Sequence, residues 1–263
     1  MSAAWPRRPR LVAGNWKMNL LPAEGAALAR ELIALRAADP VSAACAVAIC
    51  PPFTALAAVG EALKGSGMHL GGQNAHWEAR GAFTGEVSCP MLAALGCRFV
   101  VIGHSERRHA MGETDEQVAR KLRAAQRDGL MPIVCTGELL DERESGRTAE
   151  VLVRQISAAF VGLTPEAARA TVVAYEPVWA IGTGKVATPG QASEAHRVIR
   201  ATLDRVVGAE TGNAVAILYG GSVNAGNAAT LFAEEEIDGA LVGGASLEAA
   251  GFWKIVAAAS SRA

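Results

Sequence analysis

The chain lacks the patterns that mark several large classes of protein. Its 25 basic residues nearly balance its 26 acidic ones, and it has no basic block or basic patch interleaved with aromatic side chains. Nucleic-acid binding is therefore not expected. Long hydrophobic runs are also missing, because Pro51 and Pro52 interrupt the apolar stretch over residues 41–60. We expect neither a membrane span nor a secretory signal.

Cysteine is scarce, and its spacing argues against the usual cysteine-based sites. The five cysteines are odd in number, form no Cys-x-x-Cys pair and lie mostly inside apolar runs; they are Cys45, Cys50, Cys89, Cys97 and Cys135. Such residues are typical of reduced core positions in a cytoplasmic protein rather than of disulfides or zinc ligands. We therefore expect a cytoplasmic protein without a metal site.

The length of the chain allows one large α/β domain or two small ones, since it has 263 residues. Three arginines, Arg7, Arg8 and Arg10, lie near its start without a following apolar segment. We predict that residues 1–10 form a flexible N-terminal tail. Residues 11–260 contain no linker-like break and are predicted to form a single catalytic domain.

Eight short apolar runs recur along the chain, with segments of helical spacing between them. Each run is too short for a helix and suits a buried strand. The runs cover residues 11–13, 45–49, 68–70, 99–102, 131–134, 171–174, 215–218 and 240–242. Eight strand–helix units predict a parallel (β/α)8 barrel, the TIM barrel. A doubly wound open sheet is the rival, but Gly14-Asn-Trp-Lys17 is not the glycine fingerprint expected after its first strand.

Two short sequences mark helix starts. Thr114-Asp-Glu-Gln117 and Thr188-Pro-Gly-Gln191 both have the composition of a capping box. In that motif the Thr and Gln side chains each bond a backbone amide that the helix leaves free. Pro189 supports the second start, because proline fits the first helical position. We expect helices to begin at both places.

The stretch from Tyr175 to Lys185 carries the strongest local signal for chemistry. Glu176 stands where the sixth predicted strand ends, and Pro177 keeps it in extended geometry. An apolar segment, residues 178–181, then leads into Gly182-Thr-Gly184. Stiffness at one end and glycines at the other are typical of a lid that covers a small polar substrate. An ordinary loop with a solvated Glu176 is the alternative.

Polar residues after the other strands are further candidates, because barrels of this kind hold their catalytic groups at the carboxyl ends of the strands. Asn15 and Lys17 follow the first strand and alternate with Trp16, so both project towards the barrel mouth. His104 has the same parity as Val100 and Ile102 of the fourth strand. It also precedes a helix start, whose positive end disfavours a protonated imidazole.

Glycine pairs follow the last two strands. Gly220-Gly221 precedes Ser222, and Gly243-Gly244 follows the eighth strand. Such pairs expose backbone amides where these barrels hold phosphate, and Gly182 can add a third side. A tight turn is the alternative explanation for either pair alone.

Together these candidates suit proton abstraction beside a carbonyl on a small phosphorylated substrate. They comprise a carboxylate, a neutral imidazole, a cation and a group of backbone amides that can bind an anion. These features do not separate an isomerase from an aldolase. A class I aldolase-like barrel stays open, since Lys17 can form a Schiff base. The place of Lys17 beside Asn15 favours an electrostatic role.

Seven motifs closely resemble the triosephosphate isomerase family and occur in the family's order. They are Gly14–Asn19, Cys50–Thr54, Gly81–Glu86, Ile102–Arg108, Ala174–Lys185, Tyr219–Val223 and Leu241–Leu247. The resemblance implies an aldose–ketose isomerase of glycolysis and gluconeogenesis. Such an enzyme interconverts dihydroxyacetone phosphate and D-glyceraldehyde 3-phosphate through an enediolate, with no cofactor and no metal.

The resemblance also implies the roles of residues, and the first two are the known assignments of that family. Glu176 is the base, and His104 is the neutral imidazole that polarises the carbonyl. Asn15 and Lys17 bind substrate and offset the enediolate charge. The backbone amides of Gly182, Ser222, Gly243 and Gly244 bind the phosphate. Glu106 pairs with Lys17, and Ser105 and Cys135 support the site.

The connection after the third strand, residues 73–86, is too apolar at Trp77 and Phe83 for a free surface loop. In the family this loop enters a neighbouring subunit. The resemblance therefore implies a homodimer with Trp77, Phe83 and Thr84 at the interface, where Thr84 reaches the region of Asn15 and Lys17.

One departure from the family is visible after the fifth strand. The family usually has isoleucine where Thr136 follows Cys135 in this chain. We expect Thr136 to loosen packing near the base without removing a catalytic group. Cys135 is not expected to act as a nucleophile, because its strand is apolar and no base stands beside it.

Overall fold

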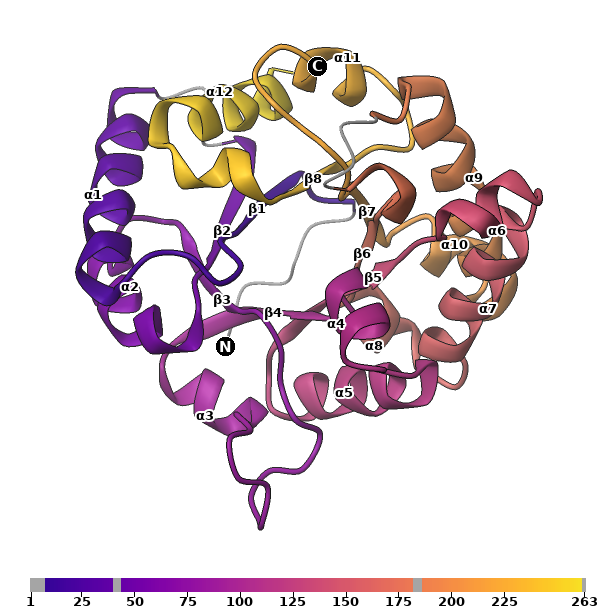
Figure 1. Cartoon of the computed structure of the whole chain (residues 1–263), viewed down its shortest axis with the longest axis horizontal. Helices are drawn as coiled ribbons and strands as arrows, with labels where there is room; N and C mark the ends of the chain where they lie inside the picture. Colours follow the sequence, from indigo (N-terminus) through magenta and orange to yellow (C-terminus); the bar gives the residue numbers. More distant parts are fainter. Residues whose placement is uncertain (1–7, 40–43, 182–185, 262–263) are drawn as a thin grey trace.

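Eight parallel strands close into a barrel in chain order, with β8 paired to β1 (Figure 1). They are β1 (Leu11–Asn15), β2 (Ala46–Cys50), β3 (His69–Gly72), β4 (Cys97–Ile102), β5 (Met131–Thr136), β6 (Val172–Tyr175), β7 (Ala216–Tyr219) and β8 (Gly239–Val242). The computed structural model describes residues 8–39, 44–181 and 186–261. Each of the eight apolar runs overlaps one strand, so the predicted (β/α)8 barrel is confirmed.

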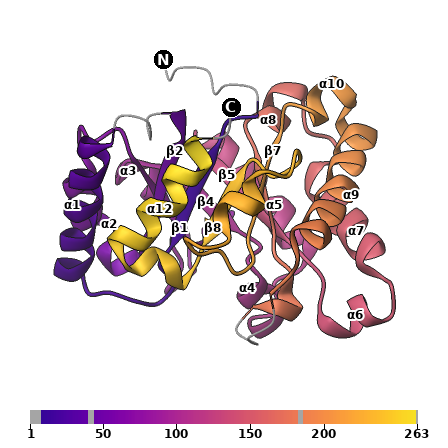
Figure 2. The same ribbon diagram turned by 90° about the horizontal axis from the view of Figure 1, so that it is seen from above.

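Helices form a ring around the barrel. They are α1 (Pro22–Ala38), α2 (Leu56–Leu63), α3 (Cys89–Ala94), α4 (Ser105–Ala110), α5 (Asp115–Arg127), α6 (Leu140–Glu144), α7 (Thr148–Phe160), α8 (Pro165–Arg169), α9 (Pro189–Val207), α10 (Ala209–Gly212), α11 (Ala228–Phe232) and α12 (Ala249–Ser260), with 3₁₀ turns η2 (Phe53–Ala55), η3 (Val178–Ala180) and η4 (Gly244–Leu247). Figure 2 shows α8 and α10 towards one end of the barrel and α4 and α6 towards the other. Because α4 and α6 follow the carboxyl ends of β4 and β5, they mark the catalytic rim of this architecture.

Both predicted capping boxes are present at helix starts. Thr114 Oγ1 accepts from the Gln117 amide at 3.2 Å, and Gln117 Oε1 accepts from the Thr114 amide at 2.9 Å. Thr188 and Gln191 exchange the same two bonds at 3.2 and 3.0 Å. These bonds satisfy amides that have no partner within a helix, so α5 and α9 begin where the sequence predicts.

The core has two layers, because alternate residues of each strand face opposite sides. In β4, Phe99 and Val101 belong to the cluster that fills the barrel. Val100 and Ile102 belong to the larger cluster between the strands and the helices. Both faces of every strand are thus buried, which explains why the strands read as unbroken apolar runs.

The five cysteines are free and buried. Burial raises the pKa of the Cys45 thiol to about 12, so the group stays protonated and unreactive near neutral pH. Among the described residues, no helix combines the length and apolarity that a bilayer crossing requires. In the same part of the chain, His, Cys, Asp and Glu side chains form no group of three able to hold a metal.

The first described residues are bonded to the amino end of the barrel. Arg8 Nε lies 3.0 Å from Asp238 Oδ1, and the Arg10 guanidinium donates to the Ala259 carbonyl at 2.8 Å. Arg8 and Arg10, which belong to the predicted tail over residues 1–10, thus make contacts with the barrel domain. A flexible tail over residues 1–7 stays a prediction, because these residues lie outside the described part of the chain.

Candidate active site

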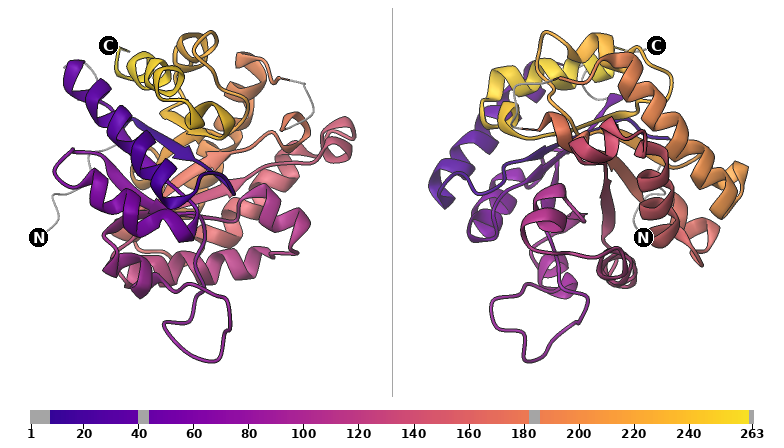
Figure 3. Two further views of the ribbon diagram at one scale, coloured as in Figure 1. Left: turned by 60° about the vertical axis from the view of Figure 1, so that its left-hand side comes forward. Right: turned by 45° about the vertical axis from the view of Figure 1, so that its right-hand side comes forward.

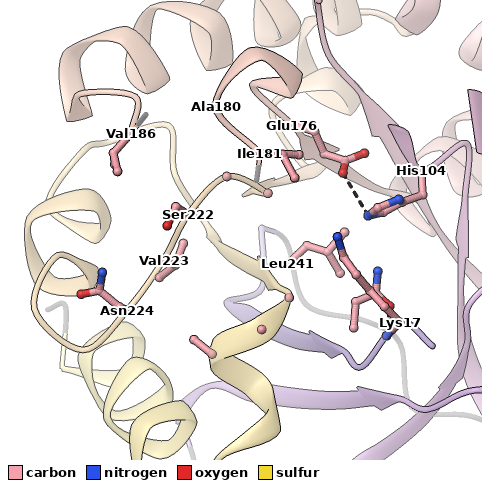
Figure 4. Close-up of a pocket in the computed structure, with 16 residues that line it drawn as sticks. Lys17, His104, Glu176, Ala180, Ile181, Val186, Ser222, Val223, Asn224 and Leu241 are labelled. Carbon is pink, nitrogen blue, oxygen red and sulfur yellow. Dashed lines mark hydrogen bonds and ion pairs between the residues drawn. The ribbon is translucent and has the colours of Figure 1, made fainter. Parts of the chain in front are cut away.

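A pocket of about 530 Å³ opens at the carboxyl rim of the barrel. Its lining includes most of the predicted site: Asn15, Lys17, His104, Glu176, Ser222, Gly243 and Gly244. These residues follow β1, β4, β6, β7 and β8. Figure 4 shows His104 and Glu176 pointing towards each other, with Lys17 on the same side of the pocket and Ser222 farther away. The fold thus brings together groups that lie up to about 230 positions apart in the chain.

Glu176 is almost fully buried, with 2% of its surface exposed. Its carboxylate accepts from the Ser105 amide at 2.9 Å and from Ser105 Oγ at 3.0 Å. His104 Nε2 lies 3.1 Å from Glu176 Oε1. The Glu176 amide donates to the Thr136 carbonyl at 2.7 Å, which fixes the backbone that carries the carboxylate. Ser105 therefore supports the site by holding the carboxylate, while neighbouring β5 anchors its main chain.

His104 is the N-cap residue of α4. Its Nδ1 accepts from the Glu106 amide at 3.3 Å, so in the neutral ring the proton is on Nε2. That N–H points into the pocket, towards Glu176. The helix start thus selects the tautomer that can donate to a substrate oxygen.

The direction of His104 does not follow from the alternation along β4. Its parity matches Val100 and Ile102, which face the surrounding helices. Gly103 has φ 66°, a left-handed conformation that turns the chain after the strand. A Cβ on Gly103 would lie 2.9 Å from Val118 Cγ2. Parity therefore misplaces His104, and the glycine turn is what directs the imidazole into the pocket.

Lys17 also sits on an unusual backbone, with φ 51° at a residue that has a side chain. Such a conformation costs about 1–3 kcal/mol and persists only when its surroundings impose it. Asn15 Oδ1 accepts from the Lys17 amide at 3.0 Å. Gln73 Nε2 donates to the carbonyls of Lys17 at 2.8 Å and Cys50 at 2.9 Å. Side chains from two strand ends thus hold the strained turn and direct Lys17.

The ion pair expected between Lys17 and Glu106 is present, with Nζ 2.6 Å from Oε1. Burial acts to raise the pKa of Glu106, but the Lys17 hydrogen bond, His104 and the Lys17 charge lower it overall. Glu106 therefore stays ionised and neutralises Lys17 in the free site.

The glycines of the predicted anion site, Gly243 and Gly244, line the same pocket as His104. Because η4 begins at Gly244, its first amides lack acceptors within the 3₁₀ turn. A Cβ on Gly244 would meet nothing within 4 Å, so packing against neighbours does not explain this glycine. Ser222 lines the same part of the pocket. Gly182, the fourth predicted phosphate ligand, lies outside the described residues.

The first half of the predicted lid is held by one buried carboxylate, Glu138. Its Oε1 accepts from Trp179 Nε1 at 2.9 Å and Tyr175 OH at 3.0 Å, and Arg143 lies 3.2 Å away. Beyond Trp179, Ala180 and Ile181 line the pocket. The predicted glycine hinge, residues 182–184, lies outside the described part of the chain.

Cys135 and Thr136 differ in what they add to the site. Cys135 faces the barrel interior, and burial together with the Glu176 charge raises the pKa of its thiol well above the ordinary value. Thr136 is 1% exposed, and its Oγ1 donates to Gln155 Oε1 at 2.6 Å. The expectation that Thr136 loosens packing near the base stays a prediction, and the structure adds that its hydroxyl makes a buried hydrogen bond.

Three residues have supporting roles that the sequence did not assign to them: Gln73, Glu138 and Gly220, the last of which was expected only as part of a glycine pair. Gln73 and Glu138 are polar residues just after β3 and β5, the signal that selected Asn15 and His104. Gly220 permits a close approach, because a Cβ there would lie 2.9 Å from Glu176 Cγ. The first two could have been found by applying the strand-end rule to every strand.

Comparison with known proteins agrees with this geometry. A model of the triosephosphate isomerase family matches residues 10–259. The chain belongs to the triosephosphate isomerase family. The triosephosphate isomerase of Moorella thermoacetica is 54% identical over 250 residues, which are 95% of this chain and 98% of that protein. The triosephosphate isomerase of Solibacter usitatus is 51% identical, over 95% of this chain and 99% of that protein. The triosephosphate isomerase of Chloroflexus aurantiacus is also 51% identical, over 94% of this chain and 97% of that protein.

Family membership makes the chain an enzyme of the isomerase class and places it in glycolysis. These matches support the interpretation of the chain as an isomerase and not the aldolase-like alternative. The family name does not assign roles to individual residues.

Proposed function

We propose that the chain interconverts dihydroxyacetone phosphate and D-glyceraldehyde 3-phosphate, with Glu176 as the base and His104 as the electrophile. The single observation that carries these roles is the 3.1 Å approach of His104 Nε2 to Glu176 Oε1 at the rim of a pocket that ends in an anion nest. A carboxylate and an N–H donor this close can act on adjacent atoms of one small substrate.

In the first step the Glu176 carboxylate takes a proton from the carbon beside the substrate carbonyl. The electron pair of that C–H bond moves towards the carbonyl, whose oxygen becomes an enediolate oxygen. The His104 Nε2–H and the Lys17 ammonium stabilise the developing negative charge. His104 next gives its Nε2 proton to the enediolate oxygen and takes the hydroxyl proton of the neighbouring oxygen in return. Glu176 then returns its proton to the carbon that first carried the carbonyl, and the carbonyl re-forms at the other position. To reach substrate, the carboxylate exchanges its bonds with Ser105 for contacts in the pocket.

The phosphate group lies in the nest opposite these two residues. Backbone amides at Ser222, Gly243 and Gly244 support this placement, because they suit an anion, and the two glycines carry no side chain that competes for space. Ala180 and Ile181 cover the pocket with apolar surface and limit the access of water to the enediolate. The proposed fourth ligand is Gly182.

We further propose a homodimer formed through the connection from β3 to α3, which extends away from the barrel in both views of Figure 3. The loop is stiffened by stacking: the His76 ring lies 4.3 Å from Trp77 and 4.2 Å from Phe83. Arg120 packs over the outer face of Trp77 at 4.3 Å. Phe83 nevertheless remains 42% exposed, and Thr84 is exposed beside it.

A second copy of the chain offers a matching surface for this loop. A hollow next to the active site is lined by Asn15, Lys17 and Gln73 together with Met18 and Met111, and these methionines are 94% and 65% exposed. Thr84 of a partner can reach the Asn15–Lys17 turn from there. A cytoplasmic location is proposed as well, since five free cysteines suit a reducing compartment.

The decisive experiment is incubation with dihydroxyacetone phosphate in heavy water. We expect glyceraldehyde 3-phosphate that carries deuterium at the carbon next to the aldehyde, because the base exchanges its proton with solvent. Borohydride added during turnover should leave Lys17 unmodified. Trapping of substrate on Lys17 would instead support aldolase chemistry, and no aldehyde product would refute the proposed activity.

A further inference from the structure

A glutamine on the outer ring of helices is directed at the strand that anchors the base. Gln155 belongs to α7, and 5% of its surface is exposed. Its Oε1 accepts from Thr136 Oγ1 at 2.6 Å and from the Gly137 amide at 2.9 Å. Its Nε2 faces the Gly137 carbonyl at 3.3 Å. One side chain thus binds the last residue of β5 and the residue after it.

The segment that Gln155 holds is in direct contact with the main chain of Glu176. The Thr136 carbonyl accepts from the Glu176 amide at 2.7 Å. Gly137 packs so closely that a Cβ there would lie 1.7 Å from the Glu176 carbonyl oxygen. Any displacement of Thr136 or Gly137 must therefore be passed to the backbone of the base.

The next residue extends the same support to the lid. Glu138 follows Gly137 and holds Tyr175 and Trp179, which lie on either side of Glu176 in the chain. Fixing residues 136–138 therefore fixes the main chain before, at and after the base.

We propose that Gln155 and Thr136 are positioning residues for Glu176. They touch no substrate and act only by holding the end of β5. The inference rests on the proposed role of Glu176. The Thr136 hydroxyl donates to Gln155, which an isoleucine at this position could not do. A base displaced by a fraction of an ångström loses rate while the binding of the phosphate is preserved.

Two substitutions test the proposal by removing different numbers of bonds. Gln155→Met keeps the length of the side chain and removes all three bonds, and Thr136→Val removes only the hydroxyl. We expect kcat to fall about tenfold in the first and about threefold in the second, since small misplacements cost up to about 100-fold. KM should change less than about twofold, because the nest for the phosphate is untouched.

Two further readouts separate positioning from general destabilisation. The kinetic isotope effect on kcat with substrate deuterated at the transferred position should increase in both variants, because proton transfer becomes slower relative to other steps. Thr136→Ser keeps the hydroxyl and should retain wild-type kcat.

A matched control exists at the opposite end of β6. Gln126 on α5 donates to Thr171 Oγ1 at 2.8 Å and to the Ala167 carbonyl at 2.6 Å. Thr171 directly precedes β6, away from the catalytic rim. Gln126→Met removes a comparable Gln–Thr contact and should lower stability without changing kcat or the isotope effect.

The outcomes separate this inference from the proposed function. If folded Gln155→Met keeps wild-type kcat while Glu176→Gln is inactive, the positioning role is wrong and the base assignment stands. If the wild-type enzyme does not isomerise the substrate, the proposed function itself fails. If Gln155→Met does not fold, Thr136→Val decides, and an unchanged kcat with an unchanged isotope effect overturns the inference.

Discussion

The two ends of the barrel both hold buried carboxylates, but they stabilise them in different ways. At the carboxyl rim, hydrogen-bond donors from Ser105 and His104 hold Glu176. At the amino end, Asp238 accepts from Arg8 at 3.0 Å and lies 3.4 Å from Arg200. A guanidinium binds a carboxylate with fixed geometry and full charge, whereas a hydroxyl and an amide hold it less tightly. The carboxylate at the rim is therefore held by weaker bonds than the carboxylate at the amino end.

The charged side chains at the amino end each make several bonds. Arg200 also pairs with Glu236 at 2.9 Å and donates to the carbonyls of Gly212 and Val215. Asp238 in addition accepts from the Ile217 amide at 2.9 Å. These bonds join α9 to β7 and to the start of β8, so the same cluster that neutralises charge also fixes the strands. Arginine clusters of this kind contribute to stability and leave no group free for catalysis.

The largest expected effect comes from Glu176→Gln. The amide keeps the shape of the side chain but cannot accept a proton, so kcat should fall by roughly 10³-fold or more. The free energy of unfolding should change by less than about 1 kcal/mol, because the Ser105 bonds can persist. Steady-state kinetics and urea unfolding provide the two measurements. Near-normal activity would show that another group is the base.

Arg200→Met should produce the opposite pattern. Removing this cation leaves the buried Asp238 and the half-buried Glu236 with less compensation, so the free energy of unfolding should decrease by about 3–5 kcal/mol. The kcat of the folded fraction should stay within about twofold. Arg205→Met on the exposed side of the same helix is the control and should change stability little. Loss of kcat without loss of stability would contradict the assignment of stability to the amino end and of catalysis to the carboxyl rim.

His104→Gln tests the electrophile at the rim. We expect kcat to decrease by about 100-fold, since a single preorganised donor to an oxyanion contributes on that order. The fold should be preserved, as judged by circular dichroism and the unfolding midpoint. Deuterium exchange into the substrate should slow in parallel. Undiminished exchange would remove His104 from the mechanism.

The smallest expected effect concerns the pH dependence of stability at the amino end. Burial lowers the pKa of His196 from 6.5 to about 4, while its Nδ1 faces the Glu236 carbonyl. The folded protein binds fewer protons than the unfolded chain below pH 6.5. The free energy of unfolding should therefore decrease, by about 2 kcal/mol between about pH 7.5 and pH 5.

The control for this effect is His196→Asn, which keeps a donor for the Glu236 carbonyl and removes the titration. Urea unfolding of the variant should show a flatter pH dependence over the same range. An equal slope in both proteins would mean that His196 does not cause it.

Much of the site could be predicted because two simple rules apply along the strands. Apolar runs located the strands and placed Glu176 at the end of β6, and alternation directed Asn15 towards the barrel mouth. Both residues continue the inward positions of their strands, β6 and β1. The rule failed for His104, because the left-handed Gly103 changes the direction of the chain. The His104–Glu176 contact joins two strand ends, so it becomes visible only when the barrel closes.

The supporting contacts could not be predicted from the sequence. Gln155 lies on a helix 21 positions before Glu176, and nothing in its local pattern shows that its amide turns inward towards β5. The hydrogen bond of Thr136 could not be predicted for the same reason, because the partner of its hydroxyl lies on another element. Long-range polar contacts depend on side-chain directions that periodicity does not specify.

The burial of every thiol in this chain has a practical use for bioconjugation. Maleimide reagents attack accessible thiolates, and the native cysteines are both covered and protonated near neutral pH. A single cysteine engineered on an outer helix, such as at the exposed Arg205 position, would be the one site that such reagents modify rapidly. Fluorophores or surface tethers could then be attached at one chosen point without first removing any native cysteine.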